Sequence, residues 1–107
     1  MNIEELREYA LSLAGAEECM PFGDEVLVFK VNGKMFMSTG IYRSPLQFNV
    51  KCDPDKAIEL REQYESVLPG YHMNKKHWNT IIIDGKLSKK QLKQMIDGSY
   101  LLVAKKR

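Results

Sequence analysis

The dipeptide Asn32-Gly33 is the feature of this chain that most restricts its fold. It stands between two runs rich in Val, Phe and Met, residues 25–31 and 34–39. A type I′ turn needs positive φ at both central residues, and Asn followed by Gly meets that need with the least strain. The sequence therefore predicts a tight β-hairpin.

Two further strands are expected. Apolar and polar residues alternate over residues 46–51, which predicts a strand with one buried and one solvated face. Together with the hairpin, this strand makes an antiparallel meander. Residues 80–83 predict a fourth strand, stopped by Asp84-Gly85. The turn at Pro21-Phe22-Gly23 is expected to anchor its aromatic ring in the core.

Capping residues and apolar stripes predict three helices. The first begins after Asn2, which forms a capping box with Glu5, and ends near Gly15. Asp53-Pro54 begins the second helix, and a capping box at Ser88 begins the third. The expected buried sides are Ile3, Leu6, Ala10 and Leu13; Ala57, Leu60, Arg61 and Tyr64; and Leu92, Met95, Ile96, Ser99 and Val103.

The predicted order is α-β-β-β-α-β-α. Helices beside a mainly antiparallel sheet, without strict alternation, indicate the α+β class. A chain of 107 residues is long enough for one core and too short for two, so we expect a single domain over residues 1–107.

Composition narrows the class of protein. No apolar run approaches the roughly 20 residues that span a bilayer, and the polar, acidic start resembles no targeting peptide. We therefore expect a cytoplasmic protein without a membrane partner. The two cysteines, Cys19 and Cys52, fit no metal-ligand spacing and are expected to be inert, buried thiols.

Charge is distributed unevenly along the chain. Residues 1–25 carry seven acids and one base, whereas residues 86–107 carry seven bases and one acid. The acidic head and the basic tail could pair internally, or one basic face could meet a polyanion. The net charge of +2 does not decide between them.

The segment 69–80 holds both histidines and the only Trp. Lys75 and Lys76 are suited to neutralising phosphates. Stacking on a base or sugar suits Tyr71, His77 and Trp78, and contacts with phosphate or base edges suit Asn74 and Asn79.

Each of these residues also has a structural interpretation. Trp78 could fill the core, the lysine pair could be a solvated turn, and Asn74 could cap the bend.

The sequence shows no catalytic arrangement. His72 and His77 are five residues apart, which is not the i, i+4 spacing of a helical metal pair. There is no glycine-rich phosphate loop, and no Ser or Cys has a visible base. We expect no enzyme, no cofactor and no metal, although a cation site along the acidic first helix stays an alternative.

The chain resembles the MmcQ/YjbR family. The likeness rests on Pro21-Phe22-Gly23, on residues 28–36, on Lys51-Cys52-Asp53-Pro54 and above all on the motif at residues 69–79. It runs from about Ile3 to Val103. The resemblance implies a frataxin-like α+β fold with helices on one face of an antiparallel sheet. It also implies DNA binding through wings, here the hairpin tip at residues 32–34 and the segment 72–79.

The leading hypothesis is a non-enzymatic DNA-binding protein of low sequence specificity. Phosphates would be held by Lys34, Lys51, Lys75 and Lys76, with His72, His77 and Trp78 shaping the site or stacking on the ligand. The alternative is a small adaptor that binds a protein partner or a small anion through the same loop. An exposed apolar patch without a surrounding basic field would favour the adaptor.

Overall fold

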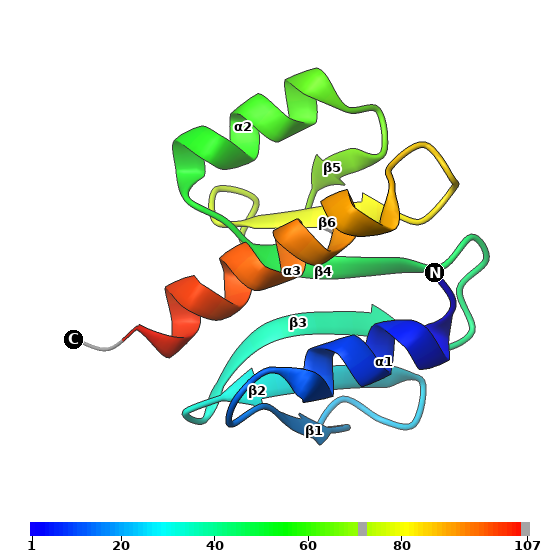
Figure 1. Cartoon of the computed structure of the whole chain (residues 1–107), viewed down its shortest axis with the longest axis vertical. Coiled ribbons are helices and arrows are strands. Elements are labelled where there is room, and N and C mark those ends of the chain that lie inside the picture. Colours follow the sequence, from blue (N-terminus) through cyan, green and yellow to red (C-terminus); the bar gives the residue numbers. More distant parts are fainter. Residues whose placement is uncertain (71–72, 106–107) are drawn as a thin grey trace.

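One six-stranded antiparallel sheet carries the fold, with strand order β1-β2-β3-β4-β6-β5. The computed structural model describes residues 1–70 and 73–105. Figure 1 shows its helices on one face of the sheet. The elements are α1 (Ile3–Ser12), β1 (Glu17–Cys19), β2 (Val26–Val31), β3 (Lys34–Gly40), β4 (Gln47–Lys51), α2 (Pro54–Gln63), β5 (Val67–Pro69), β6 (Trp78–Ile82) and α3 (Lys89–Ala104). The α+β prediction is confirmed.

The predicted hairpin forms between β2 and β3. Asn32 and Gly33 both have positive φ, 54° and 78°, as a type I′ turn requires. The meander is also confirmed, because β3 pairs with β4 antiparallel. In β4 the alternation follows the prediction, with Phe48 and Val50 buried.

The expected order lacked two short strands, β1 and β5. Each has three residues, too few for a detectable alternation. Both lie at the edges of the sheet, where the Pro69 ring breaks no central ladder and the Glu17 carboxylate discourages further strand pairing. The predicted fourth strand is β6, which begins two residues earlier, at Trp78.

All three predicted helix starts are confirmed. Asn2 and Ser88 form complete capping boxes, and the Asp53 carboxylate accepts from the Lys56 N–H at the start of α2. The first helix ends at Ser12, ahead of Gly15, which has a φ of 74° in the following turn. The capping residues therefore predicted where each helix begins, whereas the end of the first helix was predicted less accurately.

The core lies between the sheet and the helices. Its largest fully buried side chains include Phe29, Phe36 and Phe48. The apolar stripes of the helices follow the prediction in part: Leu6, Ala10, Ala57, Leu92, Ile96, Ser99 and Val103 are buried, whereas Ile3, Leu13, Leu60, Arg61, Tyr64 and Met95 are half-buried. The expectation that the Phe22 ring anchors its turn in the core is wrong, since the side chain is 70% exposed.

One hydroxyl group joins α3 to the sheet where β3 and β4 diverge. The last paired residues are Met37 and Val50, and beyond them Ser99 lies between the strands. Its Oγ donates to the Phe36 carbonyl and accepts from the Lys51 N–H. Figure 1 shows the two strands separating toward this end. Ser99 thus replaces the missing ladder bonds of the two strands.

Among the described residues, no helix combines the length and the apolar character needed to cross a membrane.

Candidate nucleic-acid interface

The loop before β6 is folded around Asn74. The Asn74 side chain accepts a hydrogen bond from the Lys76 N–H at 2.9 Å, and its carbonyl accepts from the N–H groups of His77 and Trp78. The side-chain oxygen is therefore engaged in the turn. This geometry supports the structural interpretation of Asn74 as a cap of the bend.

Arg61 of α2 fastens this loop from the helix side. Its guanidinium donates to the Lys75 carbonyl at 2.9 Å and to the Asn79 side-chain oxygen at 3.0 Å. The Asn79 amide in turn donates to the Ala57 carbonyl, and the residue is only 1% exposed. The Asn79 side chain is therefore buried and engaged by α2 and Arg61, which does not favour the predicted contact with a phosphate or a base edge.

Gly70 fixes the other side of the loop. Its N–H donates to the Trp78 carbonyl at 2.9 Å, and a Cβ on Gly70 would lie 2.8 Å from the Trp78 Cβ. Only glycine fits so close an approach. Trp78 is half-buried. Its side chain therefore lies between the two predicted alternatives, a fully buried core residue and an exposed stacking surface.

Trp78 pairs in register with Lys51 across β4 and β6. Two residues further along the same strands, Asn49 pairs with Thr80, and their side chains are hydrogen-bonded on the face away from the helices. Because side chains two residues apart share a face, Lys51 and Trp78 belong to that face too. We call it the open face of the sheet.

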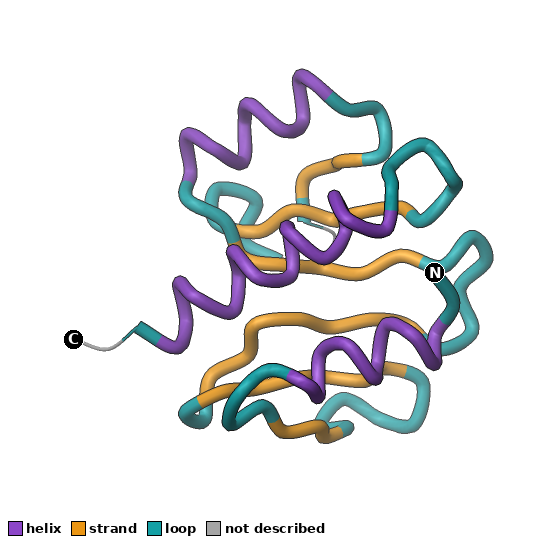
Figure 2. Tube along the Cα trace, viewed as in Figure 1, coloured by secondary structure: helices purple, strands orange, loops and turns teal. Residues whose placement is uncertain are grey.

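The four predicted lysines converge on one end of the sheet. Lys34 begins β3, Lys51 ends the antiparallel neighbour β4, and the loop with Lys75 and Lys76 leads into β6. Figure 2 places the β2–β3 turn and the loop before β6 at the same side of the sheet, the left of the view. We call this the basic end. The divergence at Ser99 divides it into two prongs, the hairpin tip and the loop.

These lysines are available for an anion. Among residues 1–70 and 73–105, the ion pairs join Arg7 to Glu18, Lys56 to Glu59, Lys86 to Glu65 and Lys89 to Glu5, and none involves a lysine of the basic end. The Lys75 ammonium makes one neutral contact, with the Gly70 carbonyl at 3.3 Å. The predicted site residues Tyr71 and His72 lie outside the described residues.

His77 and Cys52 link the loop to the end of β4. The Cys52 N–H donates to the His77 carbonyl at 2.7 Å, and both residues are half-buried. Burial raises the pKa of the Cys52 thiol, with the nearby Asp53 carboxylate adding to the shift. The thiol is therefore protonated at neutral pH and is a poor nucleophile.

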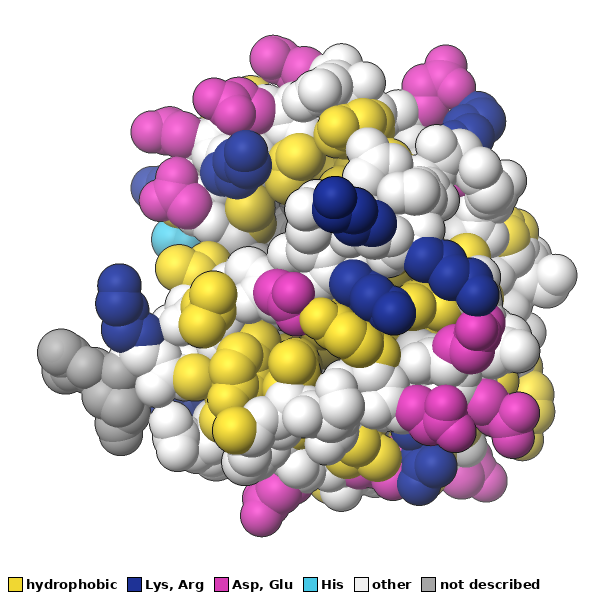
Figure 3. Space-filling view, viewed as in Figure 1, with side chains coloured by type: hydrophobic (Ala, Val, Ile, Leu, Met, Phe, Trp, Pro, Cys, Tyr) yellow, Lys and Arg dark blue, Asp and Glu magenta, His cyan; other side chains and the backbone are white. Residues whose placement is uncertain are grey.

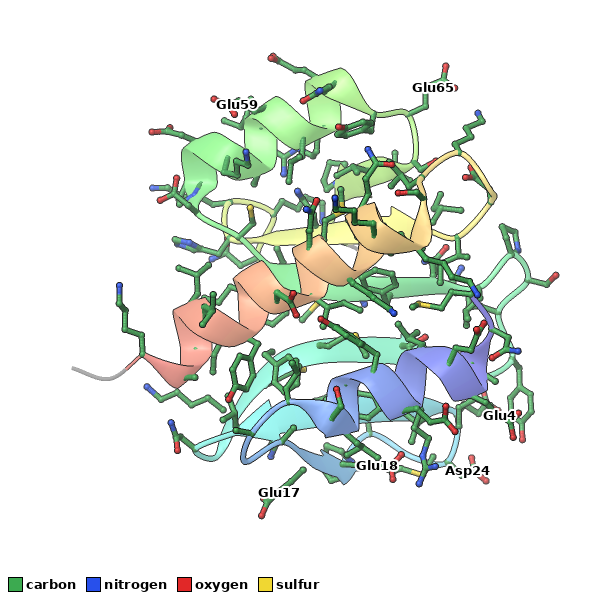
Figure 4. All side chains as sticks on the ribbon, viewed as in Figure 1. Glu4, Glu17, Glu18, Asp24, Glu59 and Glu65 are labelled. Carbon is green, nitrogen blue, oxygen red and sulfur yellow. The ribbon has the colours of Figure 1, made fainter. Side chains whose placement is uncertain are left out.

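The acidic residues labelled in Figure 4 lie on two separate parts of the molecule. In Figure 4, Glu59 and Glu65 lie on the α2 side of the molecule, and Glu4, Glu17, Glu18 and Asp24 lie around α1 and β1. Within the part of the chain that the structure describes, no group of three or more His, Cys, Asp or Glu could hold a metal ion. The acidic first helix thus shows no cation site there.

The open face carries a pocket that was not predicted from the sequence. It has a volume of about 690 Å³, and its lining includes the exposed rings of Phe22 and Tyr42 and the polar side chains of Ser38 and Asn49. The alternating polar residues of β4 were the available signal, but alternation predicts only a solvated face and not a pocket.

A second hollow, of about 580 Å³, lies on the helix side between α2 and α3. Its apolar lining includes Leu60, Met95 and Leu102. Figure 3 shows hydrophobic side chains gathered over the C-terminal part of α3 and Lys and Arg side chains over its N-terminal part. This hollow lies across the sheet from the open face, and Lys51 at the end of β4 borders it.

Sequence comparison finds similar proteins along most of the chain. A family model described as YjbR matches residues 11–102. Uncharacterized protein YbdF of Escherichia coli O157:H7 is 41% identical over 100 residues, which cover 94% of this chain and 82% of YbdF. Uncharacterized protein YjbR of Escherichia coli strain K12 is 32% identical over 100 residues, with coverages of 94% and 85%.

Solved structures share the same architecture. The crystal structure of Deinococcus radiodurans protein DR2400 superposes with a TM-score of 0.92 at 42% identity, covering 98% of this chain and 80% of that one. A crystal structure of a Pseudomonas syringae protein gives a TM-score of 0.82 at 26% identity, with coverages of 96% and 99%.

Proposed function

The chain belongs to the YjbR family, and we propose that it is a non-enzymatic DNA-binding protein of low sequence specificity. The observation that carries this proposal is the basic end. Four lysines from three separate segments lie there, outside the ion pairs of the described chain. The frataxin-like arrangement and a cytoplasmic location belong to the same proposal.

Each of the two prongs of the basic end is held in place by contacts with the rest of the fold. The hairpin tip is held against α3, since the Asn32 amide donates to the Ala104 carbonyl. The loop is held by Arg61 and Gly70. Both prongs therefore present their lysines from a supported backbone, which limits the ordering cost of binding a phosphate chain.

Low specificity follows from the kinds of groups at the basic end. Lysines contact phosphates, which are the same for every sequence. Of the two asparagines expected to contact base edges or phosphate, Asn79 is buried and the Asn74 side-chain oxygen is engaged in the turn. Trp78 can stack on any base, because every base has a π face.

The adaptor alternative receives less support from the geometry. It required an apolar patch without a basic field, whereas Trp78 is half-buried and pairs with Lys51. The hollow between α2 and α3 lies on the other side of the sheet from the side chains expected to form such a patch.

Fluorescence anisotropy with labelled DNA tests the proposal, using Lys75→Glu combined with Lys76→Glu. Each phosphate contact contributes about 0.9 to the slope of log affinity against log salt for duplex DNA. We expect wild-type binding to weaken steeply with salt, and the double variant to lose about 2 from the slope along with most of its low-salt affinity.

The matched control is Lys89→Glu with Lys90→Glu. It changes the same charge at two adjacent exposed lysines, at the start of α3 and away from the basic end. We expect this control to bind nearly as the wild type does. Equal losses in both double variants would show that overall charge, and not the basic end, governs binding; no binding by the wild type at low salt would refute DNA binding.

A further inference from the structure

We infer that the pocket on the open face accepts one unpaired base, so that the protein prefers single-stranded nucleic acid to duplex. This inference rests on the proposed function and gives it a substrate class. Three loops border the pocket, formed by residues 20–25, 41–46 and 73–77. The last of these also carries Lys75 and Lys76 of the basic end, whereas the first two lie at the opposite end of β2 and β3, so a strand that reaches both places crosses the open face.

The two exposed aromatic side chains of the pocket are the first observation. Phe22 is 70% exposed and Tyr42 is 78% exposed, and both line the same hollow. Large rings left in water over a pocket cost solvation free energy without adding to the core. Such rings are the usual stacking surfaces for bases of a single strand.

The floor of the pocket is the second observation. The Asn49 amide donates to the Ser38 hydroxyl at 3.1 Å, and the Thr80 hydroxyl donates to the Asn49 oxygen. This row crosses β3, β4 and β6. An amide has two N–H donors and an oxygen that accepts twice, so the row uses half of the capacity of Asn49.

The mixture of charges excludes a phosphate as the occupant of the pocket. Glu25 and Arg43 both line it, together with the amide of Gln47. A carboxylate repels a phosphate but accepts well from the amino group of a base. Donors and acceptors together therefore match the polar edge of a neutral base.

Size and position agree with this assignment. A volume of about 690 Å³ is within the range of small-ligand pockets and is ample for one nucleoside. Along the open face, Asn49 and Thr80 are two residues from Lys51 and Trp78. A strand whose phosphates meet the basic end can therefore place a neighbouring base over the row. A duplex keeps its bases stacked inside and cannot.

The test compares single strands with a duplex of equal length and equal label, in wild type and in Tyr42→Ala. We expect the wild type to bind the single strand at least about 5-fold more tightly. Loss of one base–aromatic stack corresponds to an affinity about 5- to 150-fold weaker, so Tyr42→Ala should weaken single-strand binding within that range and leave duplex binding unchanged. Phe22→Ala should act in the same direction.

Leu101→Ala is the control, because Leu101 is 63% exposed on α3, on the helix side of the sheet. Tyr42→Ala and Leu101→Ala each remove an exposed side chain and should leave the free energy of unfolding unchanged. Equal affinity for single strand and duplex, or no effect of Tyr42→Ala, would overturn the base pocket while the lysine variants still report on DNA binding. Failure of the wild type to bind either form would overturn both proposals.

Discussion

At the scale of single residues, Asn79 shows how a binding-type side chain can serve the fold. It joins β6 to α2 through the Ala57 carbonyl and orients Arg61, which holds the loop of the basic end. Removing a partner from a buried polar group costs about 1–3 kcal/mol. We therefore expect Asn79→Ala to lower the free energy of unfolding by about 1–3 kcal/mol, measured by urea denaturation. Asn74→Ala, at an exposed position in the same loop, should cost less; an equal or larger loss there would contradict the account.

At the scale of elements, Ser99 connects α3 with two diverging strands. Ser99→Ala would leave the Phe36 carbonyl and the Lys51 N–H without their partner, and we expect a loss of about 1–3 kcal/mol in the free energy of unfolding. The neighbouring change Gly98→Ala is a matched control, because an added Cβ meets no atom within 4 Å and alanine is the better helix former. Chemical denaturation should show opposite signs for the two substitutions, and a neutral Ser99→Ala would refute this role.

At the scale of the whole molecule, the two ends of the chain are joined by contacts of α3 with α1 and with the turn that follows it. The Glu5 carboxylate pairs with Lys89, the Tyr9 hydroxyl donates to Asp97, and the Tyr100 hydroxyl donates to the Ala14 carbonyl. Part of the acidic head and the basic tail therefore neutralise each other, while the lysines of the basic end are left for a ligand.

These contacts predict how stability depends on pH. The hydrogen bond from Lys89 lowers the pKa of Glu5. The contribution of Glu5 to the free energy of unfolding is therefore present above its unfolded pKa, about 4.3, and is lost as the pH falls through the lower pKa of the folded state. Burial, with the bond to Asp97, raises the pKa of Tyr9 to about 12. The Tyr9 contribution is therefore complete below the unfolded pKa, about 10, and is lost as the pH rises toward 12.

Tyrosinate absorbance measures the alkaline part directly. A titration step near 12 is expected for Tyr9 in the native protein, and Tyr9→Phe should remove that step. Absence of the step near 12 in the wild type, or its persistence in Tyr9→Phe, would contradict the bond between Tyr9 and Asp97.

Local signals were enough for much of the fold. The hairpin, the helix starts and the alternation in β4 depend on residues within a few positions of one another, and they were predicted correctly. The short edge strands were missed because three residues carry no period of their own. Phe22 was misplaced because an aromatic residue in a turn has no local signal for inside or outside.

The candidate site likewise has features that the sequence shows and features that depend on the tertiary structure. Its lysines and Trp78 were evident from the sequence, since charge and residue type need no partner to be recognised. The burial of Asn79, the capping role of Asn74 and the row of Ser38, Asn49 and Thr80 depend on strand order and register. These are contacts between distant residues, and a local pattern does not encode them.

The sequence therefore specified the three helices, four of the six strands of the described sheet, the α+β class and the residues with a binding character. Only the tertiary structure set which of those residues are buried and which are exposed together. It brought four lysines to one end of the sheet, buried the Asn79 side chain and formed a pocket on the face opposite the helices. This difference arises because the neighbours of a side chain are set by strand pairing between distant residues, whereas its propensity for helix, strand or turn depends on residues close to it in the sequence.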